Sequence, residues 1–260
     1  MKKFFQRVRR FLGVICILAA LTGLISRANS LPVKAESSPR DQLTEQAKDS
    51  GILDKLDDLM KWGGDRIVDI QGVANSIINS TSRHGYRQNN RPSTPVLNAV
   101  INGKWGDERS FVRVIDLDDD KPHGHSVRLK KGHTYKVVVY YINDCKYSKA
   151  AKDVSVYLDL PRQIQANNSD KLTALLASSN TDPELIFDSV TLKAQENLKL
   201  KYTKGSLKIY NQGQTNGKKL NAANAFNLNK RATLGYNQLD GEIPAGKQYS
   251  GKVTLKFRAE

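Results

Sequence analysis

The residues of this chain best suited to chemistry lie just before its middle, where four of five consecutive residues, starting at Asp116, are aspartates. Carboxylate oxygens at alternating positions are the ligands that a calcium loop supplies. An EF-hand loop that begins at Asp116 requires glycine at its sixth position and glutamate at its twelfth, where this chain has Lys121 and Val127. An EF-hand is therefore excluded. Asp116, Asp118 and Asp120 stay candidate ligands of a looser calcium site, and a solvated acidic hairpin is the alternative.

Histidines follow the aspartates closely, at His123, His125 and His133. A His-x-His pair without an assigned acid or third ligand is a weak zinc signal, so no zinc site is predicted. No cysteine-protease signature surrounds Cys145, which we interpret as a small buried side chain at the end of a strand. The sequence therefore predicts no cofactor, and calcium at the three aspartates is the one exception left open.

Motifs that would mark an enzyme do not occur in the sequence. The G-x-S-x-G nucleophile elbow, HExxH, the P-loop and the dinucleotide-binding fingerprint are all missing. A glycosidase needs only two carboxylates, which a sequence alone does not locate in space. The prediction is a non-enzymatic protein that presents a structural or binding module. The alternative is a secreted hydrolase or carbohydrate-active protein with carboxylates on its loops.

The amino terminus has the pattern of an export signal. Residues 1–10 include five basic residues and no acid, and residues 11–25 carry no charge. This apolar stretch is shorter than the roughly 20 residues of a membrane-spanning helix and matches the core of a secretory signal. Residues 1–30 are therefore predicted to be a signal peptide cleaved after Ser30 or Ala35, or a signal anchor with its basic end in the cytoplasm. Either way the protein is exported, as a secreted protein or at the extracellular face of the membrane.

Two amphipathic helices are expected in residues 41–82, after a polar, proline-bearing linker at 31–40. One apolar stripe consists of Ile52, Leu53, Leu56, Leu59 and Met60, and the second of Ile67, Ile70, Ala74, Ile77 and Ile78. The segment has eight acidic and four basic residues, which argues against a cationic helix that lies on a membrane. We expect these helices to dock on each other or on the next domain, and self-association through the stripes is the alternative.

The pattern changes to β at residue 95, after a second linker at 83–94. Residues 134–142 are rich in β-branched and aromatic side chains. Apolar residues alternate with others at 154–160, 198–202, 207–209 and 253–257, and turns are expected at Gly132, Gly205, Gly213 and Gly241. Strands with one apolar face must pack in pairs of sheets. Residues 95–260 are therefore predicted to form an immunoglobulin-like antiparallel β-sandwich, which makes the fold class mainly β.

Most of the positive charge outside the export segment lies in the β region. The formal net charge is +15; residues 1–35 hold seven basic residues and no acid, and residues 93–260 hold 26 basic and 17 acidic residues. Lys199 and Lys201 alternate with leucines, so they are expected to face solvent, with Lys204 in the turn that follows. This surface suits an anionic cell-wall polymer or a membrane surface, and export argues against nucleic acid. The alternative is that the lysines only keep an exposed strand soluble and unpaired.

Several motifs of the β region follow one another in an order and spacing typical of a known family. They are residues 95–98 (PVLN), 105–114 (WGDERSFVRV), 135–143 (YKVVVYYIN), 178–183 (SSNTDP), 234–244 (LGYNQLDGEIP) and 249–254 (YSGKVT). Over residues 95–258 the chain resembles a family of uncharacterised exported bacterial surface proteins with a conserved-repeat, immunoglobulin-like β-sandwich. It departs from that pattern at residues 142–144 and lacks the cysteine expected after Pro244. The resemblance implies fold and cell-surface localisation and assigns no catalytic residues.

Structural roles account for the polar residues of these motifs. Asp107 or Glu108 is expected to accept bonds from backbone N–H groups of a neighbouring loop, or to pair with Arg109. Tyr236 or Tyr249 is expected to close a corner between strands through its hydroxyl.

Overall fold

The structure, a computed structural model, describes residues 85–103, 106–123 and 125–260. The predicted export segment at 1–30, the linker at 31–40 and the helices at 41–82 lie outside the described residues. Within them the chain is mainly β-strand and forms two sheets, which confirms the predicted fold class at that level. None of the helices in the described part is long and apolar enough to span a bilayer.

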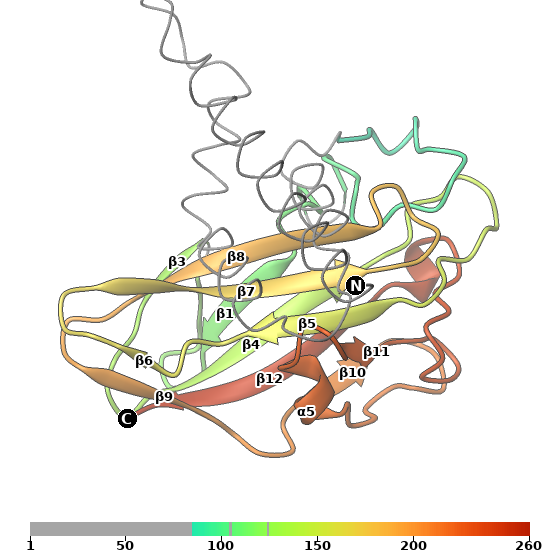
Figure 1. Ribbon diagram of the computed structural model, residues 1–260. Helices are drawn as coiled ribbons and strands as arrows, with labels where there is room; N and C mark the ends of the chain where they lie inside the picture. The colour runs from blue at the N-terminus through green and yellow to red at the C-terminus, as the bar shows by residue number, and fades with distance from the viewer. Residues whose placement is uncertain (1–84, 104–105, 124) are drawn as a thin grey trace, which may run out of the picture.

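The larger sheet is built around two long central strands (Figure 1). Its order is β2 (Lys121–His123), β1 (Val112–Asp116), β4 (Thr134–Tyr141), β12 (Gly251–Ala259), β9 (Leu198–Tyr202) and β6 (Gln163–Ile164), and β10 (Lys208–Tyr210) also pairs with β12. All of these pairs are antiparallel. The pairing of β4 with β12 runs from Tyr141 opposite Gly251 to Thr134 opposite Arg258. Residues far apart in the sequence therefore meet on one surface.

The second sheet has five strands and is mixed. Its order is β11 (Ala232–Thr233), β5 (Ser155–Asp159), β7 (Ser169–Ala177), β8 (Leu185–Lys193) and β3 (Ser126–Arg128). β3 runs parallel to β8, whereas the other pairs are antiparallel. The prediction of antiparallel sheets throughout is wrong at this edge. The reason is that β3 enters from the other sheet, so no hairpin sets its direction relative to β8.

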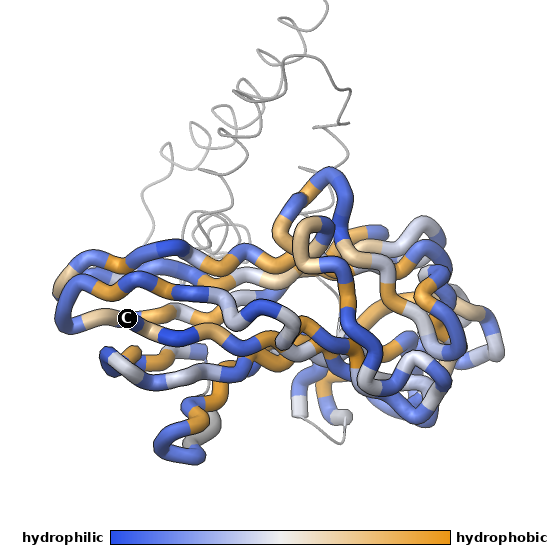
Figure 2. The backbone as a smooth tube through the Cα atoms, turned by 90° about the horizontal axis from the view of Figure 1, so that it is seen from below, coloured by the Kyte–Doolittle hydropathy of each residue, from blue (hydrophilic) through white to orange (hydrophobic). Residues whose placement is uncertain are grey.

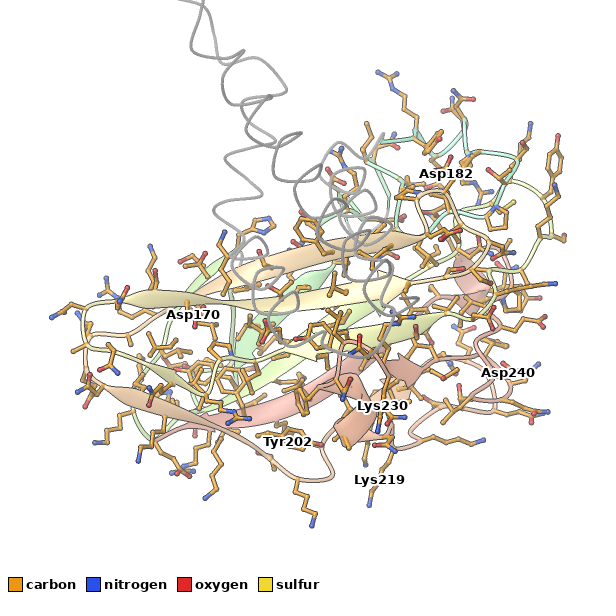
Figure 3. All side chains as sticks on the ribbon, viewed as in Figure 1. Asp170, Asp182, Tyr202, Lys219, Lys230 and Asp240 are labelled. Carbon is orange, nitrogen blue, oxygen red and sulfur yellow. The ribbon has the colours of Figure 1, made fainter. Side chains whose placement is uncertain are left out.

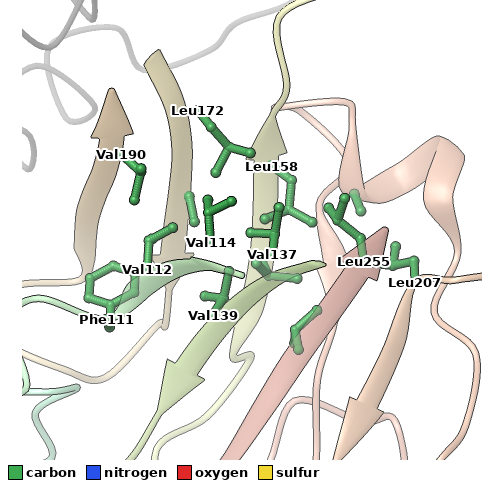
Figure 4. Packing of buried hydrophobic residues seen from close by; sticks show 14 of the residues in the cluster. Phe111, Val112, Val114, Val137, Val139, Leu158, Leu172, Val190, Leu207 and Leu255 are labelled. Carbon is green, nitrogen blue, oxygen red and sulfur yellow. The ribbon is translucent and has the colours of Figure 1, made fainter. Parts of the chain in front are cut away.

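The two sheets face each other across one hydrophobic core (Figure 4). Val114 of β1 and Val137 of β4 are fully buried and belong to the same cluster as Leu158 of β5. Figure 2 shows hydrophobic and hydrophilic residues alternating along much of the chain, as strands with one face inward require. A polar contact also joins the layers, because the Asp188 carboxylate of β8 accepts a hydrogen bond from the Val112 backbone N at 2.7 Å.

The turns expected at glycine are largely confirmed. Gly132, Gly205 and Gly241 have φ angles of 84°, 78° and 89°, a conformation that residues with a Cβ rarely adopt. Two short helices were not predicted, namely α5 (Ala222–Ala225) before β11 and the 3₁₀ helix η1 (Lys247–Tyr249) before β12. Each is only one turn long, so neither leaves a helical period in the sequence.

Tyrosines contribute to the strand corners, although other tyrosines than those predicted accept the backbone bonds. Tyr236 and Tyr249 pack edge to face, with ring centroids 4.9 Å apart. The Tyr135 hydroxyl accepts a hydrogen bond from the Lys130 backbone N at 2.7 Å. The Tyr202 hydroxyl accepts one from Leu207 N at 3.3 Å. These bonds fix the connections that leave β3 and β9.

Candidate functional site

The outer surface of the larger sheet carries a concentration of basic side chains, which we call the basic face. Its members occupy outward positions of five strands: Arg113 of β1, Lys136 of β4, Lys199 and Lys201 of β9, Lys208 of β10, and Lys252, Lys256 and Arg258 of β12. Figure 3 shows nitrogen-tipped side chains projecting from the β9 and β12 region into solvent. The other outward positions of these described strands hold no acidic residue.

Strand register places like charges opposite each other on the basic face. Lys136 of β4 lies opposite Lys256 of β12, and Arg258 of β12 lies opposite Lys201 of β9. Side chains at directly opposed positions are close neighbours, and like charges there destabilise a sheet. Among the ion pairs of the described residues, one involves the face: Lys201 Nζ lies 3.6 Å from Glu260 Oε1, with both side chains exposed. An exposed pair of this kind compensates little of the repulsion.

Tyrosines border one end of the basic face. Tyr140 of β4 and Tyr210 of β10 both lie opposite Lys252 of β12, so the lysine is placed between two aromatic side chains. Both tyrosines are half-buried. Thr254 and Val138 lie opposite each other in the next row along the strands. The face is therefore a sheet surface of lysine, arginine and tyrosine side chains, interrupted in this row by buried Val138.

The lysines singled out from the sequence lie on this face or at its edge. Lys199 and Lys201 alternate with buried Leu198 and Leu200, as predicted. Lys204 is exposed in the turn after β9. The cations of β4 and β12 were not predicted as part of the surface, because the sequence does not show that β12 lies between β4 and β9.

The acidic residues 116–120 form the turn of the β1–β2 hairpin. Asp116 is buried, and its Oδ1 accepts hydrogen bonds from Asp118 N at 3.1 Å and Asp119 N at 3.4 Å. Asp118 Oδ2 accepts a bond from Thr134 N at 2.6 Å. A hairpin is therefore present, but it is not solvated throughout as expected, because Asp116 is buried and the carboxylates of Asp116 and Asp118 hold the turn against the start of β4.

A histidine joins this cluster, and one of the three predicted aspartates does not. His133 Nδ1 lies 3.0 Å from Asp116 Oδ2, and donor atoms of Asp116, Asp118 and His133 lie within 4.8 Å of one another. Asp120 is exposed and outside this group. Calcium takes six to eight oxygen ligands, whereas two carboxylates with an imidazole suit a transition metal. Because the oxygens already accept backbone N–H bonds, we interpret the cluster as a bracing network of the hairpin.

The remaining candidate residues make contacts that fit a structural role. His125 Nε2 lies 3.4 Å from Ser110 Oγ, and the His123 side chain lies outside what the structure describes. Cys145 is free and buried, as predicted, and its Sγ donates to the Ser93 carbonyl oxygen at 3.4 Å. Arg109 pairs with Asp107, with Nη2 2.7 Å from Oδ2, which confirms one of the two expected pairings of this motif.

Sequence reasoning missed a buried pair of carboxyl groups, Glu108 and Asp144. The two residues are 7% and 1% exposed, and their carboxyl groups interact with each other. Burial raises the pKa of Glu108 to about 8, and the charge of Asp144 adds to the rise. Burial also raises the pKa of Asp144, but its Oδ2 accepts a hydrogen bond from Ala99 N at 2.7 Å, which favours the charged form of Asp144 over that of Glu108.

The position of this pair argues for a structural role. Glu108 packs against Gly103, where a Cβ would collide with its carboxyl group, and within the described residues its Oε2 has no hydrogen-bond partner. Glycosidases hold two carboxyls about 5 to 9.5 Å apart around a substrate, whereas these two are in direct contact. No local pattern identifies the pair, because the two residues lie 36 positions apart and neither has a motif of its own.

Comparison of the chain with family models, with curated proteins and with solved structures finds no match. The resemblance described above therefore stays a prediction.

Proposed function

We propose that this protein is a non-enzymatic, exported envelope protein whose β-sandwich binds an anionic cell-wall polymer through the basic face. The observation that carries the proposal is the pairing of cations across the strands, with Lys136 opposite Lys256 and Arg258 opposite Lys201. A sheet that needed lysines only for solubility would not need to oppose them. An anionic chain that lies across the strands would reduce the repulsion between the opposed cations and would be attracted by the positive potential of the basic face.

A polymer fits this surface better than a lipid bilayer. Proteins that insert into membranes present exposed apolar or aromatic side chains, and the large hydrophobic residues most exposed in the described part are Ile101, Tyr147 and Leu239, all outside the basic face. The face instead offers consecutive outward cations about 7 Å apart along β9 and at the end of β12. Tyr140 and Tyr210 flank Lys252 and offer ring faces and hydroxyls to sugar or polyol units between the anionic groups.

Export and the finer fold assignment belong to the same proposal. Export rests on the basic residues 1–10 followed by the uncharged residues 11–25. The immunoglobulin-like assignment is supported by two sheets of alternating strands around a single core. Outside the cell the available polyanions are wall polymers and lipid head groups, which is why nucleic acid is not proposed.

The test is retention of the exported chain on purified bacterial cell walls over a series of salt concentrations. We expect binding that weakens steeply as salt rises, because screening shortens the reach of exposed charges. A triple variant, Lys199→Gln, Lys201→Gln and Lys256→Gln, should lose roughly 10- to 100-fold in affinity, since each cation near an anionic surface contributes about a tenfold step or less.

The matched control removes three exposed lysines from a loop away from the face, as Lys146→Gln, Lys149→Gln and Lys152→Gln. This control has the same net charge as the triple variant, so binding that depends only on the net charge of the protein would weaken equally in both. Equal loss in the two variants, or retention that salt does not change, would overturn the proposal. Stronger binding to anionic phospholipid vesicles than to walls would replace the polymer with a membrane surface.

A further inference from the structure

The outer surface of the second sheet is unexpectedly apolar. Thr173, Leu175 and Ala177 of β7 point away from the core, since they alternate with the core residues Leu172, Ala174 and Leu176. Nevertheless they are only 4%, 6% and 9% exposed. A strand buried on both faces is typical of a sheet with a further layer packed on its outside.

One of these outward residues, Leu175, belongs to a second hydrophobic cluster, separate from the core. It consists of Leu175 and Leu185, with Tyr157, Phe187 and Leu228 packed against them, and we call it the outer patch. Tyr157 of β5, Leu175 of β7 and Phe187 of β8 are directly opposed across three neighbouring strands. The patch is therefore continuous across three strands, which at about 4.8 Å between strands span about 10 Å, the diameter of a helix.

We propose that residues 41–82 of this same chain dock on the outer patch, with the apolar stripes of the two predicted helices against Leu175, Leu185 and Phe187. We choose residues 41–82 as the occupant because they are attached to the domain by a short connection. Residue 82 is three positions from Gly85, where the described chain begins. A segment on so short a tether has a high effective concentration at a surface it can reach.

The chain enters the domain at the end of the sheet that bears the patch. Tyr86 N donates to the Ala99 carbonyl oxygen at 2.8 Å, which fixes the start of the described chain. Asp182 N, in the turn between β7 and β8, donates to the Pro95 oxygen at 3.3 Å. Ala177 and Leu185, which close that turn, are the last paired residues of the two strands. Residues 85–101 and the outer patch therefore lie at neighbouring positions (Figure 1).

The composition and charge of residues 41–82 also match those of the outer patch and its rim. Each predicted helix offers an apolar stripe of five residues, and the segment carries eight acidic against four basic residues. Cations lie beside the patch, where Lys230 and Arg231 follow Leu228 closely in the chain. Arg231 Nε is 3.1 Å from Ser155 Oγ, on the outward side of β5. An acidic amphipathic segment therefore finds apolar contact at the centre and these cations at one side of the rim, although Asp159 of β5 also lies at an outward position, opposite Thr173.

Hydrogen exchange of the exported chain tests the docking. In the wild type we expect protected amides within residues 50–79, since isolated helices this short are marginal in water. The Phe187→Ser variant should accelerate exchange there by about tenfold or more, because the patch loses a large apolar side chain. The matched control is Ile115→Ser, a half-buried outward position of the larger sheet. It should leave residues 50–79 unchanged.

A reciprocal pair of variants keeps the test valid if Phe187→Ser perturbs the sheet. Leu56→Ser lies within the first stripe, whereas Asp58→Ser lies on the opposite side of the same predicted helix. We expect Leu56→Ser to expose the patch, seen as faster exchange in β7, and Asp58→Ser not to do so. Unprotected residues 50–79 in the wild type, or equal effects within either pair, would overturn the proposal. Protection that grows with protein concentration would also overturn it, since the occupant would then belong to a second copy.

Discussion

The outer surfaces of the two sheets differ although both enclose the same core. On β12 of the larger sheet exposure alternates: Val253 and Leu255 are buried, and Lys252 and Lys256, which flank them, are in solvent. On β7 of the second sheet the alternation disappears over its last six residues, all of which are buried. A strand whose successive residues are all buried therefore indicates a covered sheet. A strand whose residues alternate between buried and exposed indicates an outer surface that meets water or a soluble ligand.

Each surface has an energetic cost when it is left alone. Opposed cations repel on the basic face, and an uncovered apolar patch favours non-specific association. The partners that we propose for the two surfaces differ in kind, a polyanion in one case and an amphipathic segment in the other. The two faces can therefore be perturbed separately, which makes their comparison testable by single substitutions.

The largest effect is expected at Leu175→Ala on the outer patch. Since Leu175 is 6% exposed, truncation should lower the free energy of unfolding by about 2 to 3 kcal/mol, close to the value for a core leucine. Urea denaturation of the exported chain measures the loss. The comparison is Lys256→Ala, at an outward and exposed position of β12, which should change stability by less than about 0.5 kcal/mol. If Leu175→Ala lowers the free energy of unfolding as little as Lys256→Ala does, the outer patch is not covered by a further layer.

The same difference explains which strands the sequence could predict. β9 and β12 each keep apolar residues on one side, so their periodicity identifies them, and β4 was identified by its β-branched and aromatic residues. β7 and β8 were missed, because continuous burial in Leu172–Ala177 and at the start of β8 removes the alternation that indicates a strand. The parallel pairing of β3 was also missed, since it depends on contacts between the sheets and not on local pattern.

The candidate site was predictable only in part for a similar reason. Lys199 and Lys201 were found because their own strand alternates. Lys136 and Arg258 join them only when β12 lies between β4 and β9, and strand order is a property of the whole fold. Likewise the calcium hypothesis included Asp120 by sequence spacing, whereas the hairpin brings His133 to Asp116 instead.

A smaller and pH-dependent effect is expected where the chain enters the domain. The carboxyl group of Glu108 interacts with that of Asp144, which accepts a bond from Ala99 N, and Ala99 in turn accepts one from Tyr86 N. Burial raises the Glu108 pKa from 4.5 to about 8. The folded state therefore keeps a proton that the unfolded chain releases. This stability is complete below pH 4.5 and is lost as the pH rises toward 8, by at most about 1.4 kcal/mol per pH unit.

Denaturation at a series of pH values, with Glu108→Gln as the variant, measures this contribution. The amide donates to Asp144 without titrating, so the decline between pH 4.5 and 8 should flatten. The Asp107→Asn control, at a partly exposed ion pair, should keep the wild-type decline. Because Glu108 holds residues 85–101 and not β12, hydrogen exchange at high pH should increase in that segment first. A decline that Glu108→Gln leaves intact would assign it to other groups.

The smallest effect, and the sharpest contrast, is expected on the basic face at Lys136→Glu. The substitution turns an opposed pair of like charges, Lys136 and Lys256, into an opposed pair of unlike charges. The sheet should therefore gain about 0.2 to 1 kcal/mol in unfolding free energy at low salt. Wall binding should weaken at the same time, because a carboxylate now stands within the surface that attracts the polyanion. Lys136→Gln, which removes the repulsion without adding attraction, should fall between the wild type and Lys136→Glu in both measurements. Stability and affinity that move in opposite directions along this series would show that the lysines are kept for a ligand. A series in which affinity stays constant would reduce the basic face to a device for solubility.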